Sequence, residues 1–246
     1  MWIVARYQAA ALFSLKAASA TASGGKTLLI PTPYAIKMAL LDAAIRTMGV
    51  SEGERLFPFL RDLAVWMQPP DDLVVIKGFG KIRRLLKDKS NEEKAREAQA
   101  RGHWPMQPTI AYREYVYYRD PFHLAFSLAG NEAQARTLQR LLLCINYFGR
   151  RGGFMQILEP PALVEQVTEQ AFIHLTPEGI ENFYADGTLQ VLDDCGPTLT
   201  FQKANIYNAE RITPGKERLF RHVVLPYRLT RSSRGYSHYQ RIMEET

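Results

Sequence analysis

The strongest structural signal in the chain is residues 27–49, TLLIPTPYAIKMALLDAAIRTMG, which predicts a short extended segment, a proline hinge and one long helix. Proline suits the first turn of a helix but not its interior, so Thr32 is the expected N-cap and Pro33 the first helical residue. Gly49 is the expected C-terminal stop. Apolar side chains recur at helical spacing, with charged ones on the other faces: Tyr34, Met38, Leu41, Ile45 and Met48, against Lys37, Asp42 and Arg46.

The segment before this helix predicts a strand and then a loop. Residues 2–15 alternate loosely between apolar and polar side chains, and residues 16–26 are small, polar and contain glycine. Within the loop, residues 20–27 read AxxxxGKT, a loose form of the phosphate-binding P-loop. Two prolines delay the helix whose backbone N–H groups would hold the phosphates, and Ala20 replaces the usual first glycine. We therefore do not expect ATP or GTP binding there.

The segments after the helix alternate between helical and strand signals. Residues 51–62 predict a second helix, interrupted at Pro58, and residues 63–68 predict a strand that ends at Pro69. Residues 109–118 and 121–128 are a pair of aromatic-rich strand candidates. Asn131 is the expected cap of a helix whose apolar positions are Leu138, Leu141, Leu142 and Ile145. A glycine turn and a strand follow in residues 147–157.

The order of these elements predicts the fold class. The first part of the chain gives strand, helix, strand, strand, helix, strand, the ferredoxin-like order that RNA-recognition folds also use. From residue 160 onward the signals are short strands and turns. We therefore predict an α+β fold, with a ferredoxin-like domain over residues 1–158 and a smaller β-rich region over residues 159–246.

Composition narrows the class of partner. The chain has 246 residues, of which 46% are apolar, enough for one large domain or two small ones. Its net charge is +6, which favours a polyanion as partner. Two cysteines are too few for a disulfide framework or a zinc site, so a reduced, cytoplasmic protein is the simplest expectation. We expect neither a membrane span nor a signal peptide, because the apolar runs are too short.

The candidates for catalysis are weak. None of the five histidines has a metal-ligand spacing, and His123 on an aromatic strand is the pattern of a packed core histidine. His103, Tyr112 and Lys89 are the residue types of a metal-independent ribonuclease, but nothing in the sequence brings them together. GxSxG is absent, Cys144 has no obvious base nearby, and the carboxylates form no metal-binding cluster. We predict no catalytic residue, no metal site and no cofactor.

Basic residues beside glycines and aromatic residues are the more informative pattern. Residues 77–89 carry six Lys or Arg against a single Asp, and the charged residues 91–102 that follow suggest an excursion from the domain. Residues 150–154, RRGGF, and 231–236, RSSRGY, join arginines to a glycine and an aromatic ring. Each pattern alone also fits a solvated surface, but together they favour nucleic-acid binding. The predicted RNA-binding residues are Lys77, Lys81, Arg83, Arg84, Lys87, Arg150, Arg151, Gly152, Phe154, Arg231 and Arg234.

Several stretches, in this order, resemble the Cas-five family, the RAMP-superfamily subunit of type I CRISPR effector complexes. They are the proline-entered helix PTPYAIKMALLDAAI, the strand pair TIAYREYVYYRDPFHLAF, the glycine turn YFGRRGGF and the late basic segment RHVVLPYRLTRSSRGYSHY. The usual glycine-rich C-terminal loop of the family is represented only by RSSRGY.

The resemblance implies an architecture and a role. It implies a ferredoxin-like (RRM-like) RAMP domain with a thumb-like insertion, here at about residues 77–108, and a smaller C-terminal β region. It implies a non-catalytic subunit that binds the 5′ handle of the guide RNA and caps the backbone filament of Cascade in antiviral defence. The implied partners are the guide RNA, the backbone subunits and the large subunit, with target DNA nearby and no membrane.

Two other functions stay open at this point. Some relatives cut the repeat RNA themselves, so a metal-independent endoribonuclease is the main alternative. The third is a basic protein-interaction module without RNA specificity. Cleavage of repeat RNA would separate the first two functions, and RNA carried through purification would separate the first from the third.

Overall fold

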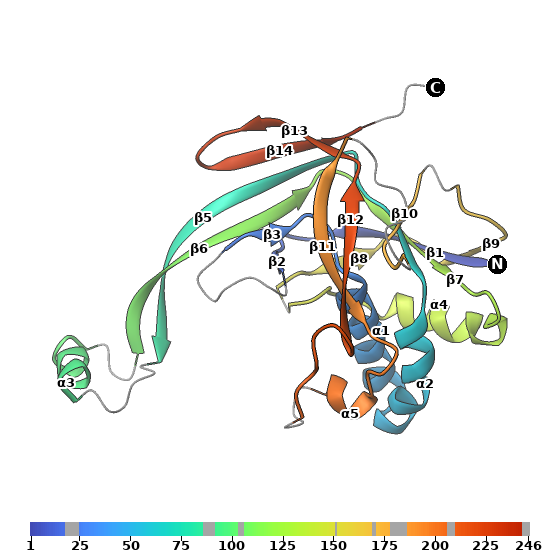
Figure 1. Cartoon of the computed structure of the whole chain (residues 1–246), viewed down its shortest axis with the longest axis horizontal. Helices are drawn as coiled ribbons and strands as arrows, with labels where there is room; N and C mark the ends of the chain where they lie inside the picture. Colours follow the sequence, from blue (N-terminus) through green and yellow to red (C-terminus); the bar gives the residue numbers. More distant parts are fainter. Residues whose placement is uncertain are drawn as a thin grey trace.

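The computed structural model describes residues 1–17, 25–85, 92–102, 106–150, 152–168, 171–177, 186–205 and 210–242. The main sheet is antiparallel and has the strand order β10-β4-β7-β1-β8, with β9 also paired to β1. Its strands are β1 (Trp2–Ala9), β4 (Val65–Gln68), β7 (Phe122–Ser127), β8 (Met155–Ile157), β9 (Ala162–Val164) and β10 (Ile173–His174). The helices α1, α2 and α4 lie together on one side of it (Figure 1).

The first strand is shorter than predicted. β1 alternates as expected, with Ile3, Ala5 and Tyr7 buried, but it ends at Ala9. The chain then bends, and the short strands β2 (Leu15–Lys16) and β3 (Thr27–Leu28) pair with each other. The loop predicted at residues 16–26 lies largely outside the described residues, and so does most of the AxxxxGKT segment.

The helix α1 (Pro33–Met48) begins and ends as predicted. The Thr32 side-chain oxygen accepts a hydrogen bond from the Ala35 backbone N–H at 3.1 Å, and Gly49 follows the helix with a φ of 92°. One prediction for its faces was wrong. Lys37, expected on a polar face, is only 2% exposed. It is buried because a strand from the C-terminal part of the chain covers that face and supplies a carboxylate, as described below.

The helix α2 (Val50–Asp62) is continuous, so the predicted interruption at Pro58 was wrong. Pro58 cannot donate a backbone hydrogen bond, but it lies on the exposed side of the helix. Leu56, Phe57 and Leu60 are buried on both sides of the proline in sequence, and their packing holds the helix together across it. Tertiary burial therefore outweighs the local cost of the proline.

The helix predicted after Asn131 is divided in two. Asn131 precedes a short 3₁₀ turn, η1 (Glu132–Gln134), and its side chain makes no capping hydrogen bond. The helix α4 (Ala135–Leu143) follows directly and buries Leu138, Leu141 and Leu142, as its periodicity predicted.

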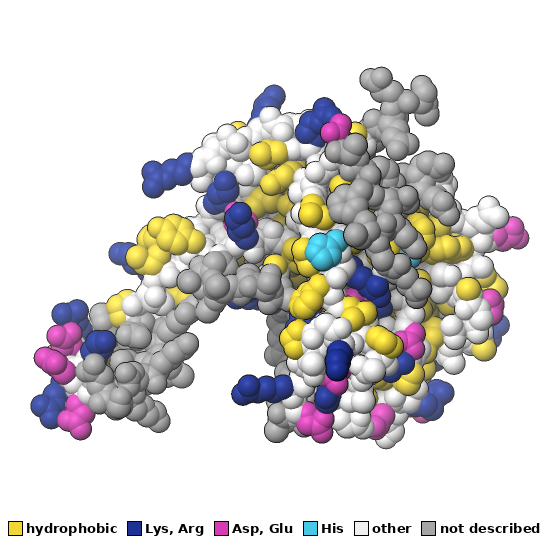
Figure 2. Space-filling model, viewed as in Figure 1, with side chains coloured by type: hydrophobic (Ala, Val, Ile, Leu, Met, Phe, Trp, Pro, Cys, Tyr) yellow, Lys and Arg dark blue, Asp and Glu magenta, His cyan; other side chains and the backbone are white. Residues whose placement is uncertain are grey.

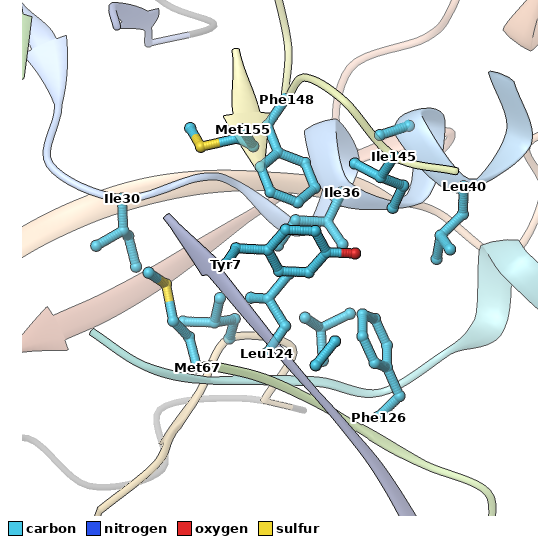
Figure 3. Packing of buried hydrophobic residues seen from close by; sticks show 14 of the residues in the cluster. Tyr7, Ile30, Ile36, Leu40, Met67, Leu124, Phe126, Ile145, Phe148 and Met155 are labelled. Carbon is cyan, nitrogen blue, oxygen red and sulfur yellow. The ribbon is translucent and has the colours of Figure 1, made fainter. Parts of the chain in front are cut away.

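The hydrophobic core lies between the main sheet and the helices (Figure 3). Tyr7 is fully buried near its centre, and its ring packs against Phe148 at 5.6 Å and Phe122 at 5.9 Å between centroids. Its hydroxyl donates a hydrogen bond of 2.7 Å to the Leu142 carbonyl, so the one polar atom of this side chain is satisfied. Burial raises the pKa of Tyr7 well above its ordinary value.

A second sheet has the order β13-β14-β5-β6, and its strands are β5 (Asp72–Leu85), β6 (Met106–Tyr118), β13 (Tyr227–Ser232) and β14 (Tyr236–Arg241). β5 and β6 form a long hairpin that leaves the body of the protein as an arm, with α3 (Glu92–Ala100) near its tip (Figure 1). The two aromatic strands predicted as a pair exist as β6 and β7 but do not pair with each other. β6 pairs with β5, whereas β7 pairs with β1 and β4, so the chain changes sheets between Tyr118 and Phe122.

The C-terminal part of the chain also forms a two-stranded ribbon, β11 (Thr188–Cys195) and β12 (Arg218–Leu225), and the short helix α5 (Phe201–Ala204). β11 lies against α1, where Asp194 forms the buried ion pair with Lys37 at 2.7 Å. Leu192, Leu199 and Leu225 join the same hydrophobic cluster as β1 and α1. The ribbon and the N-terminal part of the chain therefore share one hydrophobic core, which extends across the predicted domain boundary between residues 158 and 159.

Candidate nucleic-acid interface

One face of the arm carries two exposed aromatic rings. Phe79 on β5 lies directly opposite Tyr112 on β6, and the ring centroids are 5.3 Å apart at an angle of 59°. Phe79 is 56% exposed and Tyr112 65% exposed. Because large aromatic side chains are usually buried, two adjacent exposed rings on a projecting hairpin indicate a binding surface.

Basic side chains flank the aromatic pair on the same face. Side chains alternate along a strand, so Lys77, Lys81 and Arg83 share the face of Phe79, and all three are exposed. Figure 2 shows hydrophobic side chains beside Lys and Arg on the arm. Arg84 belongs to β5, but its side chain is not among those that the structure describes, and Lys87 lies outside the described residues. We call Lys77, Phe79, Lys81, Arg83 and Tyr112 the arm face.

The arm face begins where contact with the core ends. Nearer the body, Phe13 exchanges backbone hydrogen bonds with Val116, at 3.1 Å and 2.7 Å, and covers that part of β6. At the next position outward on this face, Glu114 accepts a hydrogen bond of 3.0 Å from the Thr27 backbone N–H. Glu114 is the carboxylate opposite Lys77 in the described hairpin, and the three cations Lys77, Lys81 and Arg83 outnumber it, so this side of the arm is positive.

The turn between β13 and β14 joins the base of the arm. The Lys77 backbone N–H donates to the Gly235 carbonyl at 2.8 Å, and the Lys77 ammonium donates to the Ser233 carbonyl at 3.5 Å. Arg231 and Arg234 are exposed on the hairpin that carries this turn. The structure thus brings together two basic segments that are 156 residues apart in sequence.

The glycine turn before β8 is a tight turn with its own backbone hydrogen bonds. Gly149 has a φ of 71°, and the Gly153 backbone N–H donates to the Arg150 carbonyl at 2.8 Å. A Cβ on Gly153 would lie 2.8 Å from the Phe148 carbonyl oxygen, whereas a Cβ on Gly152 would meet nothing within 4 Å. The packing within this turn therefore requires glycine at 153 and not at 152.

The exposed residues of this turn stand apart from the arm face. Arg150 is exposed, Phe154 is 52% exposed, and Arg151 lies outside the described residues. The Phe154 carbonyl accepts a hydrogen bond of 3.0 Å from the Ala10 backbone N–H. The segment around residues 10–13 therefore separates the glycine turn from β6, and the two predicted RNA-binding segments flank it without touching.

The residues considered for ribonuclease chemistry are not assembled among the described residues. His103 and Lys89 lie outside them, and Tyr112 belongs to the exposed aromatic pair. His123 is half-buried opposite Arg6, and its pKa is lowered first by burial and then by the Arg6 charge. In the part of the chain that the structure describes, no three His, Cys, Asp or Glu side chains are grouped to hold a metal ion. No described helix is long and apolar enough to cross a membrane.

Sequence reasoning missed the aromatic half of the arm face. The strand register pairs Phe79 with Tyr112, and no local pattern gives the register of a hairpin interrupted by residues 86–105. The available signal was period-two alternation, because Lys77, Phe79, Lys81 and Arg83 occupy alternate positions of one strand.

Comparison with known proteins shows which of them the chain is similar to. No family model matches it. It is 30% identical over 124 residues to the CRISPR-associated protein Cas5 of Archaeoglobus fulgidus, a match that covers 50% of this chain and 50% of that protein. The match therefore spans about half the length of the curated relative.

A solved structure shares the fold. The crystal structure of a CRISPR protein from Archaeoglobus fulgidus matches with a TM-score of 0.50 and 10% identity, over 99% of this chain and 92% of that chain. A chain of a CRISPR RNA-guided surveillance complex gives a TM-score of 0.48 and 16% identity, over 91% of this chain and 90% of that one. The sequence match and the shared mixed α/β fold confirm the resemblance found in the motifs: over about half its length the chain is similar to a CRISPR-associated Cas5 protein.

Proposed function

We propose that the chain is a non-catalytic subunit of a CRISPR effector complex that binds the 5′ handle of the guide RNA and caps one end of the backbone filament. The observation that carries this proposal is the arm face, where Phe79 and Tyr112 are exposed between Lys77 and Lys81. Aromatic rings stack on unpaired bases while Lys and Arg bind phosphates, the two interactions that single-stranded RNA offers a protein.

The topology supports a ferredoxin-like RAMP domain as the body. The elements β1, α1, β4, β7, α4 and β8 follow one another along the chain, apart from α2 and the arm, and their strands lie in the order β4-β7-β1-β8. The two helices pack on one side of an antiparallel sheet, as the ferredoxin-like motif requires. The arm, inserted between β4 and β7, is the proposed thumb. Residues 159–246 are the proposed β-rich region, although they share the core of the body.

The positions of the basic segments support the binding mode. The arm face and the β13–β14 turn meet at Lys77, and the segment around residues 10–13 hydrogen-bonds to Phe154, beside the glycine turn, and to β6. An RNA strand that follows the arm toward the body therefore meets Lys and Arg along its path. The proposed protein partners are the backbone subunits and the large subunit, with target DNA nearby.

A binding assay without divalent metal tests the function. We expect the full chain to bind a guide RNA that carries its 5′ handle more tightly than the same RNA without the handle, and to leave both intact on a denaturing gel. Cleavage of repeat RNA in EDTA would make the protein an endoribonuclease instead. Equal, weak binding of both RNAs would contradict handle recognition.

A further inference from the structure

The second sheet has another face, which points away from the core. Opposed residues of antiparallel strands share a face, so Tyr236, Ile76 and Tyr115 form one row across β14, β5 and β6. His238, Val74 and Tyr117 form the next row. The alternate residues Leu73, Val75 and Val116 are buried in the core, so these two rows face outward, away from the side of the arm face.

This outer face carries exposed rings. Tyr117 is 49% exposed, Tyr236 is 40% exposed, and Ile76 between their strands is 37% exposed. Beside Tyr117 the surface is hollowed, with a cavity of about 230 Å³. Small-molecule pockets usually start at roughly 300 Å³, so this hollow suits a single flat ring better than a whole cofactor. It is lined by both apolar and polar side chains: Asp72, Leu73, Val74, Tyr117, Arg119, His238 and Gln240.

The polar groups of the hollow hold one another in place. His238 Nε2 lies 2.8 Å from Asp72 Oδ1, and His238 Nδ1 lies 3.3 Å from the Thr230 hydroxyl, so both ring nitrogens have partners. Arg119 lies 3.7 Å from Asp72 Oδ2, but its side chain is 69% exposed. Most of its guanidinium donors therefore face outward, at the rim of the hollow.

The charge around the hollow matches a polyanion. Arg231 lies opposite His238, and Arg113 lies opposite Gly78 on the same outer face. Among the described residues, neither Arg113 nor Arg231 has a carboxylate within ion-pairing distance. Asp72 is the carboxylate of the hollow, and it already has the Arg119 guanidinium at 3.7 Å and the His238 ring at 2.8 Å as partners.

We propose that this hollow binds one unpaired base of a single-stranded nucleic acid, with the Tyr117 ring stacked on the base and Arg119 on an adjacent phosphate. The site is separate from the arm face and goes beyond handle binding. The protein therefore holds single-stranded nucleic acid on both faces of one sheet. A protein partner for the same surface is the competing outcome that the experiment decides.

Photocrosslinking with a labelled 5-bromouridine decamer locates the contact. The full chain and its Phe79→Ala/Tyr112→Ala variant are crosslinked, digested and mapped by mass spectrometry. We expect a crosslink in the peptide that contains Tyr117 in both proteins, because the hollow acts without the arm face. Crosslinks confined to the arm face or the glycine turn would overturn the proposal and leave the outer face to a protein partner.

Affinity measurements on Tyr117 then test stacking. Stacking on a base stabilises the complex, so Tyr117→Ala should weaken decamer binding by about five-fold or more when it is measured in the Phe79→Ala/Tyr112→Ala background. Tyr117→Phe keeps the ring and should bind the decamer as tightly as its parent. Tyr117→Phe and Tyr117→Ala should both have the parent's melting temperature, because the side chain is half exposed. Equal losses in Tyr117→Phe and Tyr117→Ala, or no loss in either, would overturn the stacking contact. The comparison of guide RNA with and without its 5′ handle can fail while the decamer still crosslinks at Tyr117, so failure of handle recognition and failure of this site are distinguishable.

Discussion

The Lys37 ammonium lies 2.7 Å from the Asp194 carboxylate, and this ion pair joins α1 to β11 inside the protein. The two side chains are 3% and 2% exposed, and Arg221 approaches the same carboxylate at 3.5 Å. Asp194 also accepts the Cys195 backbone N–H at 2.8 Å. One carboxylate therefore serves two cations and a backbone donor, so the C-terminal ribbon and the N-terminal helix depend on each other for stability.

Removing this carboxylate should be costly. Asp194→Ala leaves Lys37 buried without its counter-ion, and breaking a buried pair costs about 3–5 kcal/mol of unfolding free energy. Urea denaturation measures the loss. The matched control is Asp42→Ala, which breaks the exposed Asp42–Arg46 pair and should cost at most about 1 kcal/mol. Similar losses in the two variants would show that the buried pair does not join the ribbon to the helix.

The two adjacent glycines of the turn should respond differently. Gly153→Ala forces a Cβ to within 2.8 Å of the Phe148 carbonyl oxygen and should cost about 1–3 kcal/mol of stability. Gly152→Ala meets open space and should change stability by less than about 0.5 kcal/mol. Thermal unfolding of both variants checks this. A larger effect at Gly152 would contradict the geometry described for this turn.

The basic residues of the arm face should set the salt dependence of RNA binding. Lys81→Ala/Arg83→Ala should lower the slope of log affinity against log salt by about 1.4, at roughly 0.7 per lost phosphate contact on a single strand. Arg55→Ala is the control, because Arg55 is exposed on α2, away from the arm (Figure 1). An unchanged slope in the double variant would assign Lys81 and Arg83 to an ordinary solvated surface.

Asp72 should make the second sheet sensitive to acid. Its pKa is lowered from the ordinary 3.8, first by the hydrogen bond from His238 and in smaller part by Gln240 and Arg119. A lowered folded-state pKa gives stability that is present above about pH 4 and is lost as the pH falls through the lower folded value. Asp72→Asn should therefore be less stable than the parent at pH 7, with the difference shrinking toward pH 2. Acid titrations followed by circular dichroism give the comparison, and a constant difference would contradict the linkage.

Local features of the fold were predictable from sequence, and long-range ones were not. The N-cap at Thr32 and the stop at Gly49 depend on residues within one turn of the helix. The burial of Lys37 depends on Asp194, which is 157 residues away, and no local pattern reveals it. Likewise, the arginines and lysines of β5 could be recognised in the sequence as a basic segment. That Phe79 lies opposite Tyr112 follows only from the register in which β5 and β6 pair.

The central claim is that the arm face binds RNA, and the affinity of the Phe79→Ala/Tyr112→Ala variant for handle-bearing guide RNA tests it most directly. Each ring that stacks on a base contributes about 1–3 kcal/mol, so loss of both should weaken binding by at least about ten-fold. Leu143→Ala is the matched control, because Leu143 is 48% exposed at the end of α4, and it should bind RNA normally. Full affinity in the double variant, with both proteins folded, would contradict the account.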